Sequence, residues 1–202
     1  MKLILSILTV VVGLSSAPQA YSFSNSSPQV ASSNSGLAVV LIDMQLGFYR
    51  RGGVIGTQGL NSLVLNQQKL LKWAKGNLIP VLVLQYDGFD VTDPNLMSII
   101  TKGRYRVIQK DNDGGFYGES HNEVLRTLKN WNVDTLIVAG INGPYCVKST
   151  IEGALENGFN IMTTHYVIGN LNQNPPIYPN GVWSFKNAKL TIFPTLESII
   201  RP

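Results

Sequence analysis

The sequence is poor in cysteine, in histidine and in charged residues. Its 202 residues include one Cys and two His, and charged residues make up 14%. One cysteine cannot build a disulfide framework, and two histidines form no His/Cys cluster at the spacing of a metal site. The hydrophobic content of 44% is enough for an apolar core and excludes a disordered chain. We therefore expect a core-stabilised globular domain that binds no metal and no cofactor.

Positive charge is present but scattered. The formal net charge is +4, from 16 Lys and Arg against 12 Asp and Glu. The one local cluster consists of Lys102, Arg104, Arg106 and Lys110. Nucleic-acid binding usually needs a longer basic run or stripe, often with interleaved aromatic residues. We therefore expect a small-molecule partner and no nucleic acid.

The N-terminus has the pattern of an export signal. Lys2 precedes an apolar run at residues 3–14, and small residues follow, among them Ala17 and Ala20. The run is short for a membrane span, although an uncleaved anchor is the alternative interpretation. We predict a signal peptide at residues 1–22, whose cleavage site stays open, and a flexible Ser/Asn-rich leader at 23–35. The folded domain then spans residues 36–202, in a periplasmic or secreted protein that leaves the membrane after cleavage.

Apolar runs and helical patterns alternate along this domain. Continuous apolar runs are typical of strands buried on both faces, and strands that alternate with helices predict a parallel sheet covered on both sides. The sequence therefore predicts an α/β fold of three layers, α/β/α, with a mostly parallel central sheet. The expected strands lie at residues 37–42, 79–84, 106–109, 135–139, 160–167 and 190–193, and the expected helices begin near residues 61, 120, 147 and 195.

Polar residues follow several of these strands, where open α/β sheets bind their ligands. Asp43 ends the first strand, and Lys110 ends a strand predicted to lie in the middle of the sheet. Cys146 lies between a strand and a helix, where the positive end of the helix dipole favours a thiolate. An acid, a cation and a thiol at one sheet edge would form a nucleophile set. The alternative for the single cysteine is a passive buried residue or an intermolecular link.

Three segments together resemble the isochorismatase-like cysteine hydrolases. They are Leu41-Ile42-Asp43-Met44-Gln45, then Gln109-Lys110 with Gly115-Phe116-Tyr117-Gly118, and Val138-Ala139-Gly140-Ile141 through Cys146-Val147. The resemblance implies Asp43 as general base, Lys110 as its electrostatic partner and Cys146 as nucleophile. It also implies a cis peptide bond between Ile141 and Asn142, and backbone N–H groups of Asn142 and Cys146 that bind an oxyanion.

Two departures from the family pattern bear on the substrate. Gly143-Pro144 replaces the polar residues common there, and it places Tyr145 beside the nucleophile. The family's nicotinamidase branch has metal-binding histidines after the second strand, whereas residues 85–90 contain none. We therefore expect no metal and disfavour nicotinamide. Gln45, Phe48, Phe116 and Tyr145 are the candidate substrate-binding residues, and Tyr145 stands out by its position.

The sequence thus predicts a cysteine hydrolase for a small amide or carbamoyl compound, acting through a Cys-Lys-Asp triad and a thioester intermediate. Two alternatives stay open. One is hydrolysis of a vinyl ether, as isochorismatases perform it, and the other is an exported binding protein of the same fold without turnover. Members of the family commonly form dimers or tetramers, so the resemblance implies a homodimer or homotetramer.

Overall fold

A computed structural model describes residues 36–51, 57–170 and 189–201. The chain divides into two units, Met1–Val30 and Ala31–Pro202, and every described residue lies in the second. The predicted signal peptide and leader therefore lie outside the described residues. Among the residues that are described, no helix is long and apolar enough to cross a membrane.

Strands and helices alternate through most of the domain, as predicted. The elements are β1 (Leu37–Ile42), α1 (Leu46–Arg51), α2 (Thr57–Gly76), β2 (Val81–Tyr86), α3 (Pro94–Ile100), β3 (Tyr105–Lys110), the 3-10 turn η1 (Gly118–Ser120), α4 (His121–Asn130), β4 (Thr135–Gly140), the π-helical turn η2 (Gly143–Val147), α5 (Lys148–Glu156), β5 (Asn160–Thr163), the 3-10 turn η3 (His165–Val167), β6 (Leu190–Ile192) and α6 (Glu197–Ile200).

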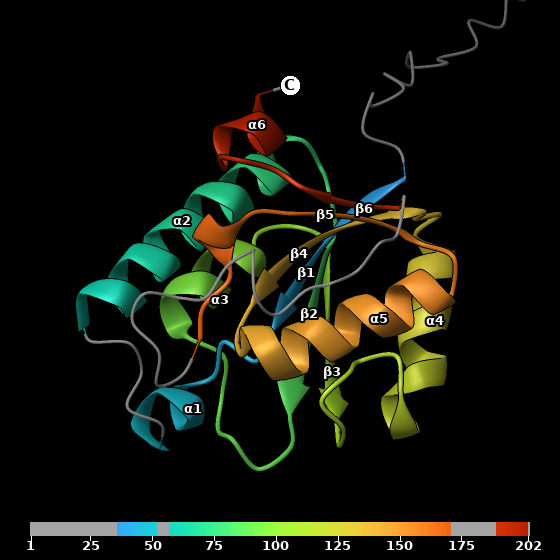
Figure 1. Ribbon diagram of the computed structural model, residues 1–202, viewed down its shortest axis with the longest axis horizontal. Helices are drawn as coiled ribbons and strands as arrows, with labels where there is room; N and C mark the ends of the chain where they lie inside the picture. Colours follow the sequence, from blue (N-terminus) through green and yellow to red (C-terminus); the bar gives the residue numbers. More distant parts are fainter. Residues whose placement is uncertain (1–35, 52–56, 171–188, 202) are drawn as a thin grey trace, which may run out of the picture. The chain divides into compact units, whose positions relative to one another are not determined.

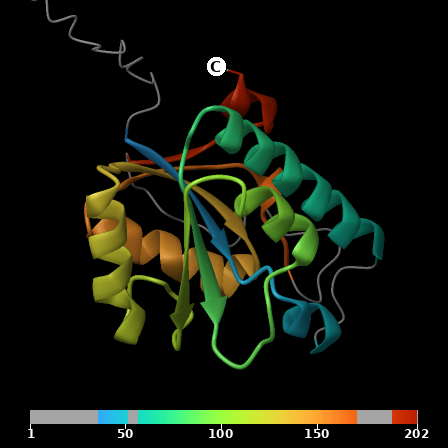
Figure 2. The same cartoon turned by 180° about the vertical axis from the view of Figure 1, so that it is seen from behind.

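The described strands form one sheet in the order β3-β2-β1-β4-β5-β6, and every neighbouring pair is parallel. Helices α2 and α3 cover one face of this sheet, and α4 and α5 cover the other (Figures 1 and 2). The predicted α/β/α architecture is therefore confirmed. Strand β1 has β2 on one side and β4 on the other. The chain adds β2 and β3 on the first side and then β4, β5 and β6 on the second, so its direction of winding reverses between β1 and β4.

Burial explains which strands were easy to predict. Strands β1, β2 and β4 are buried along nearly their whole length, which matches their continuous apolar runs. Strand β3 was expected in the middle of the sheet, but it is the edge strand of the described sheet, with a neighbour on one side only. Its first residues are exposed, whereas Ile108 and Lys110 are buried. The Lys110 side chain therefore points into the protein.

Several local predictions differ from the structure. The predicted strand at residues 160–167 ends at Thr163, because the chain turns into η3. Ser120 does not cap α4 through its side chain, since its hydroxyl donates to the carbonyl oxygens of Gly115 and Tyr117 instead. Helix α3 was not predicted, although Asp93 accepts a hydrogen bond at its start and Pro94 occupies its first turn.

Gly140 allows β4 to approach β1 at the point where the winding reverses. Its φ is +140°, and a Cβ at this position would lie 2.2 Å from the carbonyl oxygen of Ile42. Next to it, the N–H of Ile141 donates to the same carbonyl at 3.0 Å. A side chain here would push apart the two strands whose ends carry Asp43 and Cys146.

We expect Gly140→Ala to lower the free energy of unfolding by at least about 2 kcal/mol, through backbone strain and this collision. Urea unfolding followed by circular dichroism measures the change. Gly76→Ala is the control, because a Cβ at the end of α2 meets no atom within 4 Å. The control should change stability by no more than about 0.5 kcal/mol. Equal stability of the two variants would contradict the close approach.

Candidate active site

A buried ion pair lies at the carboxyl edge of the sheet. Asp43 directly follows β1, and Lys110 is the last residue of β3. The Lys110 Nζ lies 2.9 Å from Oδ2 of Asp43, and neither side chain is exposed to solvent. The Asp43 backbone has a φ of +50° and its N–H donates to the Leu84 carbonyl, which turns the chain sharply at the end of the strand.

The Lys110 side chain reaches Asp43 across an intervening strand. Strand β2 lies between β1 and β3, and neighbouring strands are about 4.8 Å apart, so the two backbones are separated by roughly 10 Å. The ammonium group lies 4.2 Å from the centre of the Tyr86 ring, a cation–π contact, and also donates to the carbonyl of Asn112 at 2.9 Å. A shorter side chain at position 110 could not make this bridge.

Cys146 lies across the winding reversal from Asp43, in the turn η2 that joins β4 to α5. The carbonyl of Asn142 accepts hydrogen bonds from the N–H groups of Tyr145 and Val147, both at 3.1 Å, and so closes the turn around the cysteine. The peptide bond between Ile141 and Asn142 is cis, as the resemblance implied. Cys146 is only 5% exposed, and its Sγ lies 3.7 Å from Oδ1 of Asp113.

Burial and charge together favour a neutral thiol beside an ionisable carboxylate. Burial raises the pKa of Asp43 from its ordinary 3.8 to about 6, although the Lys110 ammonium lowers it. Burial also raises the pKa of the Cys146 thiol well above its ordinary value, and the Asp43 carboxylate adds to this while Lys110 opposes it. The neutral thiol is therefore favoured over the thiolate expected at a helix N-terminus. Asp43 lies close enough to act on the pKa of the thiol, whereas the thiol itself donates to Oδ1 of Asp113.

The structure places the four candidate substrate-binding residues in different surroundings. Gln45 is buried, and its amide donates to the carbonyls of Tyr86 and Asp90 and accepts from the Tyr86 N–H. It therefore ties the end of β1 to the loop after β2. Phe116 is 1% exposed and its ring packs 5.6 Å from that of Phe159, which is a core environment.

The other two candidates are accessible. The ring of Phe48 is partly buried and stacks on Phe89 at 4.1 Å, and both rings contact the edge or face of Tyr86. Tyr145 is 60% exposed and lies next to the nucleophile. Contact of any of the four with a substrate stays a prediction, and the placement favours Phe48 and Tyr145 over Gln45 and Phe116.

Sequence reasoning missed two residues of this site. Asp113 was overlooked because an exposed acid in a polar loop is ordinary, yet its place between Lys110 and Phe116 was a usable signal. Tyr86 was not singled out as a site residue, because an aromatic residue near the end of a strand usually packs in the core. Together with Asn112, Gly114, Tyr117 and Ser149, these two residues line a hollow of about 290 Å³ next to the thiol.

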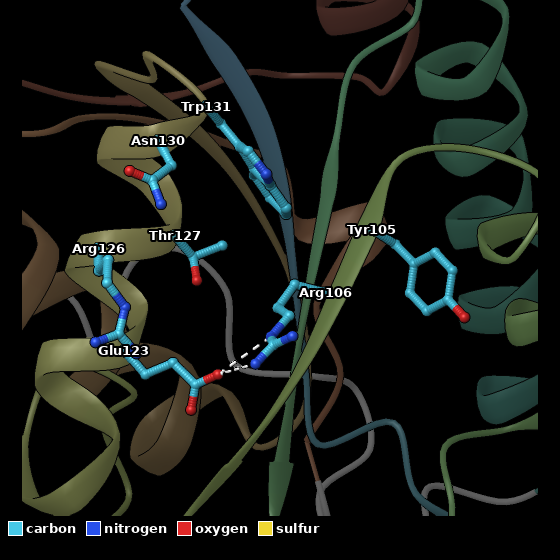
Figure 3. A pocket seen from close by; sticks show the side chains of 7 residues that line it. All are labelled: Tyr105, Arg106, Glu123, Arg126, Thr127, Asn130 and Trp131. Carbon is cyan, nitrogen blue, oxygen red and sulfur yellow. Dashed lines mark hydrogen bonds and ion pairs between the residues drawn. The ribbon is translucent and has the colours of Figure 1, made fainter.

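A second hollow of similar volume lies between β3 and α4 (Figure 3). Arg106 and Glu123 form an ion pair across it, with 3.1 Å between Nε and Oε1, and Trp131 stands at one end. The pair is largely solvated and contributes little to stability. This hollow contains no thiol, and it begins at the opposite end of β3 from Lys110. Within the described residues, no three His, Cys, Asp or Glu side chains are placed to hold a metal ion.

Solved structures share this fold. A putative isochorismatase from Burkholderia xenovorans LB400 matches with a TM-score of 0.58 at 20% identity, over 66% of this chain and 67% of that one. An N-carbamoylsarcosine amidase from Thermoplasma acidophilum matches at 0.54 and 19%, over 68% and 86%. YcaC from Pseudomonas aeruginosa, solved with hexane-2,5-diol and covalent acrylamide, matches at 0.55 and 20%, over 67% and 65%. The chain thus spans about two thirds of the length of two of these proteins.

The sequence itself matches the model of the isochorismatase domain over residues 37–165, from β1 to η3. A search of curated proteins finds no match. The matched region contains Asp43, Lys110 and Cys146. The chain therefore belongs to the isochorismatase family.

Proposed function

We propose that this member of the isochorismatase family is a cysteine hydrolase that cleaves the C–N bond of a small linear amide or carbamoyl compound. The observation that carries the proposal is the placement of the Cys146 thiol beside the buried Asp43–Lys110 pair at the winding reversal of the sheet. Asp43 can accept the proton of this thiol, and the positive charge of Lys110 offsets the negative charge of the Asp43 carboxylate. The proposed chemistry uses no metal.

The reaction has two halves. The Cys146 thiol transfers its proton to Asp43 while its sulfur attacks the carbonyl carbon, and the carbonyl oxygen takes up the negative charge. When the intermediate collapses, the C–N bond breaks, Asp43 returns the proton to the departing nitrogen, and a thioester remains on Cys146. Water then adds to the thioester, Asp43 accepts a proton from it, and the acid leaves as the thiol re-forms.

Lys110 supports this cycle from a fixed position. Its ammonium group is bound by Asp43, by the carbonyl of Asn112 and by the face of Tyr86. It offsets the carboxylate's charge when Asp43 is ionised. The oxyanion role of the Asn142 and Cys146 N–H groups stays a prediction, supported by the turn that wraps Cys146 at the start of α5.

One protein of the same fold is an N-carbamoylsarcosine amidase, which is consistent with hydrolysis of a carbamoyl compound. Another holds acrylamide covalently, which is consistent with a nucleophile in a protein of this fold. Export of the mature chain and its assembly into a homodimer or homotetramer remain proposals that rest on the N-terminal pattern and on the resemblance. Size-exclusion chromatography with light scattering tests the oligomeric state directly.

The test of the proposed function is a panel of small primary amides, ureas and carbamoyl compounds, read by ammonia release from the purified chain. A substrate found in this way should leave an acyl adduct on Cys146 after acid quenching, and intact mass spectrometry with peptide mapping measures it. Hydroxylamine should release the adduct as a hydroxamate. Ammonia release that yields neither an adduct nor, with hydroxylamine present during turnover, any hydroxamate would contradict the thioester step. No release across the panel would favour a binding protein of this fold.

The pH dependence of kcat/KM should follow the ionisation of Asp43. Because burial raises its pKa to about 6, the carboxylate is protonated below that pH and cannot accept the thiol proton. We therefore expect kcat/KM to fall on the acid side with a midpoint near pH 6, and about tenfold for each further pH unit. An ordinary aspartate would place this midpoint about two units lower. Constant kcat/KM from pH 7 down to pH 4.5 would exclude Asp43 as the base.

A further inference from the structure

Asp113 places a second carboxylate beside the nucleophile, and the proposed reaction gives it no task. Its Oδ1 is 3.7 Å from Sγ of Cys146, and its side chain is exposed at the rim of the hollow next to the thiol. Asp43, the proposed base, is buried and paired with Lys110. A carboxylate beside a thiol opposes formation of the thiolate, so Asp113 by itself works against the nucleophile.

The loop that carries Asp113 is held in place on both sides. The Lys110 ammonium binds the carbonyl of Asn112, and the hydroxyl of Thr150 on α5 accepts the N–H of Gly115. Gly114 and Gly115 pack so closely that a Cβ on them would lie 2.5 Å from the Tyr117 ring and 2.3 Å from Leu84. Tight packing of the neighbouring residues therefore fixes the position of Asp113, and this fixed position leaves its carboxylate exposed.

In the absence of a substrate, negative side chains outnumber positive ones among the charged groups that act on the thiol. Among the described charged side chains that shift the pKa of Cys146, Asp43 and Asp113 are negative and Lys110 is positive. The ammonium of Lys110 is already paired with Asp43 in the interior. The hollow that Asp113 lines therefore offers one carboxylate close to the thiol, with the Tyr86 and Tyr117 rings as walls. A carboxylate flanked by aromatic rings is a suitable site for a cation.

We propose that Asp113 is a specificity-determining residue that selects amides carrying an ammonium or guanidinium group near the scissile carbonyl. This inference rests on the proposed amide hydrolysis. A cationic group bound at Asp113 would neutralise the carboxylate, so the thiolate would form most easily when such a substrate is present. The same arrangement would disfavour anionic amides, because their carboxylate would face Asp113 across the hollow.

Charged thiol reagents test this without any turnover. Cys146 is the only thiol in the sequence, so its labelling by 2-(trimethylammonium)ethyl and by 2-sulfonatoethyl methanethiosulfonate can be followed by intact mass. We expect the cationic reagent to react faster by roughly tenfold, and Asp113→Asn to remove most of this preference. The ratio of the two rates cancels any change in thiolate fraction. Asp111→Asn is the matched control, because it removes the same charge from the same loop and should keep the preference.

Equal rates for the two reagents in the unaltered protein would overturn the inference, and so would absence of labelling by either, because the hollow would then not lead to the thiol. A preference that survives Asp113→Asn would also overturn it. Thermal melts of both variants establish that they are folded.

A pair of substrates of matched shape extends the test to catalysis. 4-Aminobutanamide and pentanamide differ in one terminal group, which is an ammonium in the first and a methyl in the second. We expect kcat/KM to favour the ammonium by about tenfold, and to lose this preference in Asp113→Asn but not in Asp111→Asn. Hydrolysis of both amides without preference would overturn the inference on Asp113 and leave the proposed function intact. Hydrolysis of neither would contradict the proposed function, and the reagent ratio would still decide the role of Asp113.

Discussion

Cys146→Ala should abolish amide hydrolysis, with a fall of at least about a thousandfold in kcat/KM, because no other group in the sequence can form the thioester. The substitution should leave the fold intact. The side chain is small, 5% exposed and makes no disulfide, so the alanine removes little packing. Ammonia release from the best amide of the panel measures the loss, and a thermal melt establishes that the variant is folded.

Two further variants sharpen this prediction. Cys146→Ser keeps the shape of the side chain and a hydrogen-bond donor near Asp43 and Asp113. It should nevertheless be nearly as inactive as Cys146→Ala. A hydroxyl is a much weaker acid than a thiol, so the Asp43 carboxylate is too weak a base to deprotonate it. Ser149→Ala is the matched control, since Ser149 lines the same hollow without taking part in the chemistry. It should retain activity within about fivefold. More than a tenth of the original kcat/KM in Cys146→Ala would exclude the covalent mechanism.

Asp43→Asn should lower the free energy of unfolding by about 3–5 kcal/mol, because it leaves the fully buried Lys110 ammonium without its counter-charge. The backbone is not the cause of this loss, since Asn tolerates the φ of +50° that Asp43 adopts. Urea unfolding at pH 7 measures the change. The double variant Asp43→Asn/Lys110→Met removes both charges and keeps the side-chain length at position 110, so it should regain most of the stability.

The single variant Asp43→Asn and the double variant Asp43→Asn/Lys110→Met should differ in stability but not in activity. The double variant should remain inactive although it is stable, because it has neither base nor cation beside the thiol. Glu152→Gln is the control, since it breaks the partly exposed Lys148–Glu152 pair, whose atoms are 2.7 Å apart. It should cost no more than about 0.5 kcal/mol, because solvent already screens those charges. A double variant as unstable as Asp43→Asn would show that shape, and not charge, stabilises this position.

Much of the sheet could be predicted from the sequence, and so could the meeting of Asp43, Lys110 and Cys146 at its carboxyl edge. The runs that became β1, β2 and β4 are buried on both faces, and such strands carry their signal in every residue. Strand β3 was misplaced in the middle of the sheet, because strand order follows from packing and not from any local pattern. The burial of Phe116 and Gln45 could not be foreseen, because sequence position does not tell toward which neighbours a side chain points.

An α/β domain with one thiol, and with an acid and a lysine after buried strands, can be predicted from the sequence alone. These features depend on residue type and local periodicity, which are properties of short segments. Only the packing of the fold brings the groups together. It placed β1 beside β4, sent Lys110 across β2 to Asp43, and brought Asp113 within 3.7 Å of the sulfur. Those distances join residues far apart in the chain, and burial then changed their proton affinities, so neither could be predicted from local sequence alone.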